Sequence, residues 1–565
     1  RDNPVFLWLL EHGAAGERRI GRVAAHFIRK AVEKMFDFIL VNGTVVDGSG
    51  AAGFVADVAI ENGKIMEIAP KIKAPATQKI DAAGKFVTPG FVDIHRHADI
   101  NLFTENFGIA ELRQGITTMV NGNCGLSAVP CPPPYRDAIL SFLEPVIGSA
   151  QNMPYFTDFA SYLAAVRTVK LPLHCGMLVG NGTVRAAVKG YDGGDLSTEA
   201  LQKAQEYLSA SLQAGALGVT LGIVYAPEYH YTAEQFIKVL QPMRTFHVPL
   251  VTHIRGEGDN FLSSLQEVIH IAKALAVPLH ISHLKCIGKR NWGTGVTNAL
   301  RLLNDARAAG MDITWDAYPY TAGSTQLVQI LPPQYLAGGT AGIVAALSDG
   351  AKRATLQKIL EEPSDTFENL VNLVGWDKIV LSTLHLPENQ KYVGKTVTEI
   401  ADMQGKTPFD CACDLLIAEQ CKIAMVDHIT AESDIKMILQ TPQCSVISDS
   451  VYPCGGVPHP RLYGTFPRIL AKYVRAEKAL TIEAAIHKMT AQPAAVYGLS
   501  KGLLQVGQDA DINVFDLAAI ETKATYTQPK QYATGFSAVL VGGRLAVEND
   551  AYTGLCAGKM LLRGD

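Results

Sequence analysis

Six side chains of the types that bind transition metals stand at or just after short apolar runs of this sequence. Histidine nitrogen, cysteine sulfur and carboxylate oxygen are the ligands that proteins use for such ions. Residues two apart on a strand face the same way, so the pair in Ile94-His95-Arg96-His97 can point together. The candidate ligands are His95, His97, Cys124, His253, His283 and Asp449.

This set of side chains predicts metal-assisted hydrolysis. A thiolate ligand favours Zn²⁺ over Mg²⁺, and a bound zinc ion lowers the pKa of water towards about 7. A carboxylate beside that water, here Asp449, can accept its proton and later deliver it to a leaving amine. We therefore predict a zinc centre with Asp449 as general base and acid.

Each of these residues also has a purely structural interpretation. A cysteine beside a strand is more often a small buried residue, and Asp449 in Ser-Asp-Ser could simply form a turn. The order of the whole series favours ligands for both. His280 alternates with His283 on the same run and should face away from it, so we predict a structural role for His280.

The elements that must position these residues alternate between strands and helices. Expected strands end near His97, Cys124, Val179, Tyr225, His253, His283, Tyr318 and Asp449. Helical patterns lie between most of them, for example over 198–213 and 260–274. Such units predict an α/β fold, a (β/α)₈ TIM barrel over 88–490 with its chemistry at the carboxyl ends of the strands. A mainly helical insertion over 325–443, before the last barrel strand, is expected to act as a lid or substrate subdomain.

Both ends of the chain have a different pattern. Short alternating strands joined by Asn-Gly and Asp-Gly turns predict one small β-sandwich domain assembled from residues 35–87 and 491–565. Residues 1–34 precede this pattern. Their basic residues follow the short apolar stretch, which is the wrong order for a signal peptide, so we interpret them as an added extension or a targeting helix.

Composition narrows the class of protein. A chain of 565 residues with 48% hydrophobic and 18% charged residues suits a soluble enzyme of two or more domains. The net charge of −4 argues against a nucleic-acid partner. No apolar run approaches the ~20 residues of a membrane helix. The 10 cysteines are scattered, which favours reduced thiols and a cytoplasmic location. The oligomeric state stays open.

Several longer motifs resemble the amidohydrolase superfamily and, more narrowly, the N-acyl-D-amino-acid deacylases, or D-aminoacylases. The resemblance runs from about Phe36 to about Gly543. In most two-metal members of the superfamily a carboxylated lysine bridges the metals, and here Cys124 stands in that place. The motifs are Gly-Asn-Cys124-Gly, Thr-His253-Ile-Arg-Gly-Glu-Gly-Asp, Ile-Ser-His283-Leu-Lys285-Cys, Asp316-Ala-Tyr-Pro-Tyr-Thr-Ala-Gly-Ser324 and His459-Pro-Arg-Leu-Tyr-Gly-Thr-Phe-Pro-Arg468.

The resemblance implies a role for each matching residue. Cys124, His253 and His283 would hold one tight zinc ion. His95, His97 and Asp449, with Cys124 as a bridge, would form a second, weaker site. The residues expected to bind the substrate, chiefly its α-carboxylate, are Lys285, Tyr318, Ser324 and Arg461, with Tyr225 beside them. Arg96 should point away from the metal and pair with an acid.

The function implied is hydrolysis of N-acyl-D-amino acids to a carboxylate and a free D-amino acid, with a small-molecule substrate as the partner. A cyclic-amide hydrolase of the hydantoinase or dihydroorotase type is the first alternative. A one-metal deaminase is another, although a bridging cysteine and Lys285 speak against it. A non-catalytic scaffold of the same fold would have lost a ligand or the acid, and none is missing. The acyl group and the amino-acid side chain are not evident from the sequence.

Overall fold

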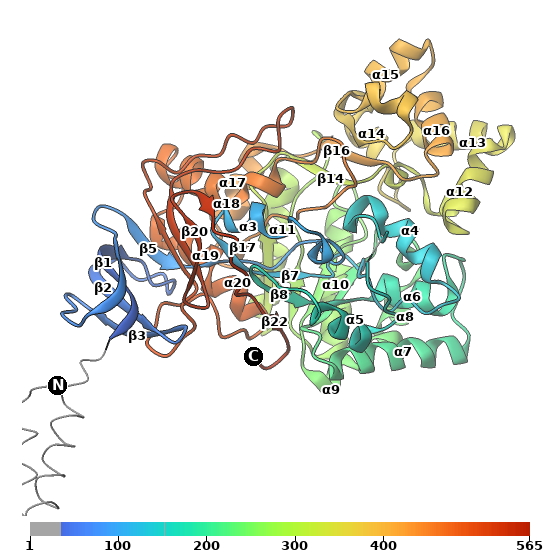
Figure 1. The fold of residues 1–565 in the computed structure, drawn as a ribbon. Helices are drawn as coiled ribbons and strands as arrows, with labels where there is room; N and C mark the ends of the chain where they lie inside the picture. The colour runs from blue at the N-terminus through green and yellow to red at the C-terminus, as the bar shows by residue number, and fades with distance from the viewer. Residues whose placement is uncertain (1–34, 152) are drawn as a thin grey trace, which may run out of the picture.

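The computed structural model describes residues 35–151 and 153–565, so the expectations for residues 1–34 lie outside the described residues. Within that part of the chain, eight parallel strands form a central barrel, which confirms the predicted fold (Figure 1). One of the eight is interrupted after Met177 and continues as a second short strand. The barrel strands are β6 (Phe91–Asp93), β7 (Ile116–Asn121), β8 (His174–Met177) with β9 (Val179–Gly180), β10 (Val219–Gly222), β11 (Leu250–His253), β12 (Leu279–Ile281), β13 (Ile313–Ala317) and β17 (Cys444–Val446).

The barrel closes between its first and last strands. The backbone N–H of Asp449 donates to the carbonyl of His95 at 2.9 Å, and that of His97 donates to the carbonyl of Ser450 at 3.0 Å. Asp449 and the first histidine pair therefore lie on the two sides of the closing seam. Residues far apart in the chain meet here at the carboxyl ends of the strands.

Helices cover the barrel from outside, as the alternating pattern predicted. The helix expected over 198–213 is α7 (Thr198–Gln213), which begins after Ser197, whose hydroxyl accepts from the N–H of Ala200. The helix expected over 260–274 is α10 (Phe261–Leu275). The other outer helices are α3 (Ile109–Leu112), α4 (Arg136–Ile147), α5 (Phe159–Val166), α6 (Asn181–Lys189), α8 (Ala233–Val239), α9 (Met243–Phe246), α11 (Thr294–Ala308), α17 (Glu432–Leu439), α18 (Arg461–Arg468), α19 (Ile482–Met489) and α20 (Ala491–Val496).

A small β domain is built from both ends of the described chain, as predicted. Its strands hydrogen-bond as one continuous sheet, and the antiparallel pairing of β5 with β18 joins the two halves. Buried side chains from both halves share one apolar cluster. The strands are β1 (Phe36–Val45), β2 (Phe54–Glu61), β3 (Lys64–Ala69), β4 (Ala76–Asp81), β5 (Phe86–Pro89), β18 (Ile512–Phe515), β19 (Phe536–Val541), β20 (Arg544–Glu548) and β21 (Ala551–Tyr552).

The two Asn-Gly pairs of this domain behave differently. Asn62 and Gly63 form the predicted hairpin turn, and both have positive φ. The prediction is wrong for Asn42 and Gly43, which lie inside β1 where its register with β2 shifts. A Cβ on Gly43 would come 2.4 Å from a methyl group of Val87, so the glycine permits the neighbouring strand to pass.

The insertion contains a three-stranded antiparallel sheet and a group of helices that projects from one side of the barrel mouth (Figure 1). Its strands are β14 (Ala322–Gln326), β15 (Ile379–Thr383) and β16 (Ala424–His428). Its helices are α12 (Gly339–Ser348), α13 (Gly350–Glu361), α14 (Leu370–Val374), α15 (Val397–Gln404) and α16 (Pro408–Ala418). The sheet adjoins the barrel mouth, so its side chains can reach the site.

Several elements cross the expected domain limits, among them β5 and β14, whose residues lie on both sides of a predicted boundary. Helix α17 falls within 325–443 but packs against β13 and β17 of the barrel. Helix α20 contacts β6 and β17, and the final strand β22 (Met560–Leu561) pairs with β8. Among the described residues, no helix combines the length and apolar character needed to cross a bilayer.

Candidate metal centre

All six predicted ligands meet at the carboxyl ends of the barrel strands. His95 Nε2 lies 3.2 Å from Cys124 Sγ, and His283 Nε2 lies 3.5 Å from the same sulfur. Nε2 of His95 and of His97 each lie 3.4 Å from Asp449 Oδ1. Donors around one tetrahedral zinc ion are about 3.5 Å apart, because zinc–ligand bonds are about 2.0–2.3 Å long.

The six donors form two groups that share the cysteine. One contains His95, His97, Cys124 and Asp449, and the other contains Cys124, His253 and His283. In each group, the ligand atoms all lie within 4.8 Å of one another. Cys124 can therefore contribute to two adjacent sites.

The backbone turns three of these ligands inward. Cys124, His283 and Asp449 have φ values of 55°, 35° and 52°, a left-handed conformation that is uncommon for residues other than glycine. Non-glycine residues held in this region often occur at functional sites, where the surrounding structure stabilises them. Asn123 provides such support, because its side-chain amide donates to the carbonyl of Val120 at 3.1 Å.

The charges of the site favour the ionised forms of its cysteine and aspartate. Burial alone would raise the pKa of the Cys124 thiol, but the imidazoles of His95 and His283 outweigh it and hold that pKa well below its usual range. Burial would likewise raise the pKa of Asp449, and Arg461 with His95 holds it well below normal. Thiolate and carboxylate are the forms that bind a metal.

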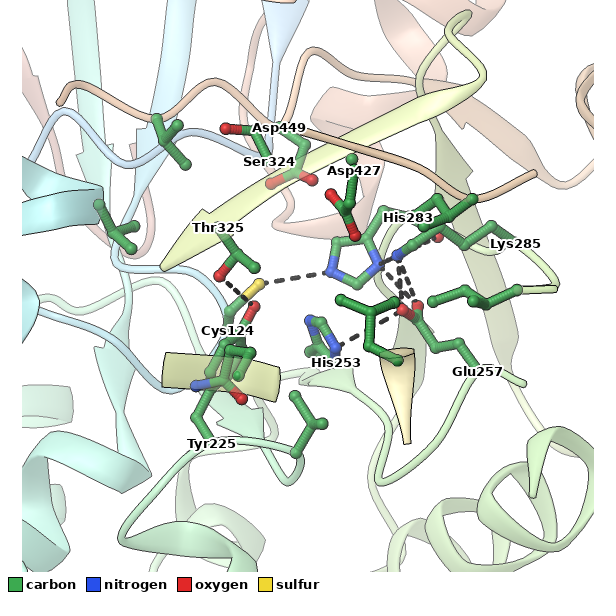
Figure 2. Close-up of a pocket in the computed structure, with 18 of the residues that line it drawn as sticks. Cys124, Tyr225, His253, Glu257, His283, Lys285, Ser324, Thr325, Asp427 and Asp449 are labelled. Atoms are coloured by element: carbon green, nitrogen blue, oxygen red, sulfur yellow. Dashed lines mark hydrogen bonds and ion pairs between the residues drawn. The ribbon is translucent and has the colours of Figure 1, made fainter. Parts of the chain in front are cut away.

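Two buried carboxylates behind the ligands were not identified from the sequence. Glu257 lies 3.0 Å from His283 Nδ1 and 3.6 Å from His253 Nε2, so it can orient both rings (Figure 2). Lys285, together with these histidines, overcomes the effect of burial and lowers the pKa of Glu257 to about 2. The available signal was an acid four residues after a ligand, with a glycine on each side.

Asp316 is the second of these carboxylates. It lies 3.5 Å from His95 Nδ1 and 2.9 Å from His280 Nε2, and it accepts a hydrogen bond from the backbone N–H of His283. His280 also lies 2.7 Å from the hydroxyl of Thr314. It stands apart from both ligand groups, in agreement with the structural role predicted for it.

Arg96 points away from the ligands, as predicted. Its guanidinium pairs with Asp93 at 2.9 Å and Glu111 at 2.5 Å, and it donates to the hydroxyl of Tyr452. All of these groups are buried or nearly so. The arginine therefore fixes the strand that carries His95 and His97.

A cavity opens beside the ligands. Four of the five predicted substrate-binding residues line it: Tyr225, Lys285, Tyr318 and Ser324. The fifth, Arg461, lies just behind the wall, where it donates to the carbonyl of Ser324 at 3.0 Å. Its guanidinium also stacks 4.9 Å from the centre of the Tyr318 ring.

Both cations near the cavity already contact carboxylates. Lys285 Nζ lies 2.7 Å from Glu257, and Arg461 Nη1 lies 2.9 Å from Asp449. The hydroxyl of Tyr318 is buried without a hydrogen-bond partner. Lys285 and Tyr318 therefore present donors at the cavity wall, with the guanidinium of Arg461 behind it.

Two other histidines, His459 and His230, do not line the cavity. His459 is buried and contacts the carbonyl of Ala322 at 3.0 Å, while its other nitrogen accepts from the N–H of Arg461. His230 lies on the outside of the barrel mouth beside Gly193. His459 therefore supports the arginine rather than the ligands.

Comparison with known proteins places this geometry in a family. The sequence profile of the amidohydrolase family matches residues 78–547. The chain belongs to the amidohydrolase family. This amidohydrolase is 32% identical to a D-aminoacylase of Alcaligenes xylosoxydans xylosoxydans, over 94% of the chain and 98% of that protein. It is also 32% identical to an N-acyl-D-glutamate deacylase of the same organism, over 91% of the chain and 94% of that protein.

A solved structure gives the same result. The N-acyl-D-glutamate deacylase of Bordetella bronchiseptica superimposes with a TM-score of 0.78 and 29% identity, over 94% of this amidohydrolase and all of that chain. That enzyme was crystallised with zinc and a phosphonate inhibitor that mimics the tetrahedral intermediate of its reaction. The likeness extends over the barrel, the insertion and the small β domain.

The residues of this amidohydrolase fit a metal ion. Nδ1 of His97 and of His253 are buried without a hydrogen-bond partner, beside a thiolate and a carboxylate. Ring nitrogens that are buried in this way lack the compensation that buried polar groups normally have. Nitrogen, sulfur and oxygen donors together match a transition metal rather than magnesium or calcium.

Proposed function

We propose that this chain hydrolyses the amide bond of N-acyl-D-amino acids and releases a carboxylate and a free D-amino acid. The single observation that carries the proposal is the juxtaposition of the two ligand groups with Lys285 and Tyr318 on one cavity. The proposal is supported by the deacylase relatives, which the chain matches over nearly their whole length.

We assign Zn²⁺ to the centre. Cys124, His253 and His283 would hold the tight ion, and His95, His97 and Asp449 would complete a weaker second site through the bridging cysteine. When bound, zinc supplies Lewis-acid activation of water and of the acyl carbonyl. Glu257 and Asp316 hold the histidine rings in place.

Asp449 is the proton carrier of the proposed reaction. It is kept ionised by Arg461 and His95 against the effect of burial, so it starts in the form that accepts a proton. It takes a proton from the attacking water and delivers it to the departing amine. The barrel seam fixes its carboxylate next to the ligands, because its own backbone N–H is bonded to His95.

The α-carboxylate of the substrate binds between Lys285, Arg461 and Tyr318 in this proposal. Bonds between such cations and a carboxylate are stronger than neutral hydrogen bonds. On the other side of the cavity, Tyr225 packs against the ring of His253, with ring centres 4.9 Å apart, and narrows the cavity there. With the carboxylate anchored and the acyl amide at the ligands, the two enantiomers differ in where the side chain lies, so the cavity wall that receives the side chain selects one enantiomer.

The test combines metal content with paired substrates. The purified protein should contain zinc and release amino acid from N-acetyl-D-methionine but not from N-acetyl-L-methionine. Hydantoin serves as the control for a cyclic-amide hydrolase. Bound zinc with turnover of hydantoin alone would replace the proposal with that alternative, and turnover of the L-series alone would refute the stereochemical assignment.

A further inference from the structure

The carboxyl groups of the cavity differ in whether they have partners. Within the described part of the chain, four acidic residues line the cavity. Glu257 is paired with Lys285, and Asp449 is paired with Arg461. Glu368, which precedes α14 of the insertion, accepts hydrogen bonds from two backbone N–H groups. Three of the four carboxyl groups are therefore accounted for by the protein itself.

Asp427 on β16 is the fourth. Its residue is 4% exposed, and its Oδ1 is buried without a hydrogen-bond partner. Figure 2 shows the side chain pointing into the cavity beside His283 and Lys285. Gly323 faces it across the sheet, and a Cβ there would come 2.9 Å from Oδ1, so the glycine leaves room for the carboxyl group.

A buried acceptor of this kind implies a donor in the complex. Burial raises the pKa of Asp427 to about 6, with Lys285 and Arg461 opposing that rise, so the group is largely ionised at neutral pH. A charge buried without a partner destabilises the protein unless a ligand supplies one. The cavity lining also includes the apolar side chains of Ile429 and Leu370 and the amide of Gln329, whose Nε2 has no partner.

The cavity wall around Asp427 faces the space that is left for the substrate side chain once the α-carboxylate is bound at Lys285. Lys285 is the one lysine or arginine among the described residues that line the cavity, and the proposed function uses it for that carboxylate. A second carboxylate, at the end of a substrate side chain, would meet Asp427 without a neutralising cation. Like charges at close range in a buried site repel strongly.

Resting on the proposed function, we propose that Asp427 is a specificity-determining residue. It accepts a hydrogen bond from a donor group on the side chain of the N-acyl-D-amino acid and excludes side chains that end in a carboxylate. The preferred substrates are those with amide or basic side chains. Proteins that deacylate N-acyl-D-glutamate would differ from this chain at that wall.

The experiment compares two substrates of nearly equal shape, N-acetyl-D-glutamine and N-acetyl-D-glutamate. Wild-type kcat/KM should favour the glutamine substrate by about tenfold or more, which is the scale of one hydrogen bond to a charged group. In the Asp427→Asn variant the ratio should fall towards one, because the asparagine can also donate to a carboxylate. Asp427→Ala is the second variant, and it should give the same convergence.

The control is Asp402→Asn, the same change on an exposed face of α15 in the insertion, which should keep the wild-type ratio. N-acetyl-D-methionine reports that each variant still turns over. A glutamine-to-glutamate ratio that is unchanged in both Asp427 variants, or a wild-type preference for glutamate, would overturn this inference alone. Failure of the zinc-loaded wild type on all three substrates would instead overturn the proposed function, and the inference with it.

Discussion

At the scale of single residues, the site is defined by its buried acids and by the cations and histidines that each acid contacts. Asp449 faces the ligands and Arg461, Glu257 faces two histidines and Lys285, and neither acid is available for a purely structural role. The two acids differ in chemistry. Asp449 is the proton carrier in the proposed function, whereas Glu257 is held by its neighbours and acts through them.

Replacing Asp449 by asparagine should separate metal binding from turnover. The amide cannot accept the proton from water, so kcat should fall by about 10² to 10⁴-fold. Zinc bound at Cys124, His253 and His283 should stay near the wild-type content, measured by elemental analysis. A variant with near-normal kcat would remove Asp449 from proton transfer.

Replacing Glu257 by glutamine should instead weaken the metal site. The rings of His253 and His283 lose their charged partner, and changes of this kind reduce metal affinity by about 10- to 100-fold. Competition with a chelator measures the zinc affinity. The control is Glu234→Gln on the exposed face of α8, which should leave affinity unchanged. Equal affinity in both variants would mean that Glu257 serves Lys285 only.

At the scale of elements, the sequence predicted the barrel strands well, but it did not reveal the buried acids of the adjoining cavity wall. The strand ends at His97, His253 and His283 were evident because parallel barrel strands are buried on both faces and appear as apolar runs. Asp427 and Glu257 could not be assigned, since an acid in a strand or loop reveals its partners only in three dimensions. Asn42-Gly43 has the sequence of a turn, but its backbone is part of a bulge.

One buried ionic group contributes to the junction between the small domain and the barrel. Asp511, at the start of β18, lies 3.0 Å from His174 Nε2 of β8 and 2.7 Å from Lys501 Nζ, and it accepts from the N–H of Gly542. Despite burial, His174 and Lys501 hold the pKa of Asp511 well below its usual range. The ionised form is therefore the stable one in the folded protein.

Asp511→Asn should destabilise the fold. Removing one partner of a buried charge pair costs about 3–5 kcal/mol. Because the folded pKa is depressed, the wild-type advantage is complete above the unfolded pKa of about 3.9 and declines as pH falls from there towards the folded pKa. Thermal unfolding at pH 7 and at pH 3 measures the difference in stability between wild type and variant, with exposed Asp365→Asn as the control. A stability difference that is equal at both pH values would contradict the claim that the charge of Asp511 stabilises the fold.

At the scale of the whole molecule, the metal centre joins parts of the chain that are distant in sequence. Its candidate ligands come from the β6, β7, β11 and β12 regions and from the segment after β17, so the folded state alone presents all of them together. A ligand that binds only the folded state stabilises it by mass action.

Removing the metal should therefore lower the unfolding temperature. A zinc concentration 1,000 times the Kd contributes about 4 kcal/mol, which a chelator removes and added zinc restores. Differential scanning calorimetry with and without chelator measures the shift. The Cys124→Ala variant, which lacks the shared ligand, should show a much smaller shift. An equal shift in that variant would exclude Cys124 from the tight site.

The hydrogen-bonded seam between the first and last strands of the barrel also determines when the site can form during protein synthesis. His95 and Asp449 are joined there by a backbone hydrogen bond, although more than half of the chain lies between them. A nascent chain on the ribosome can form β6 through β13 and still lack both Asp449 and Arg461. The centre is thus assembled last, and amide hydrolysis is withheld until the barrel has closed around it.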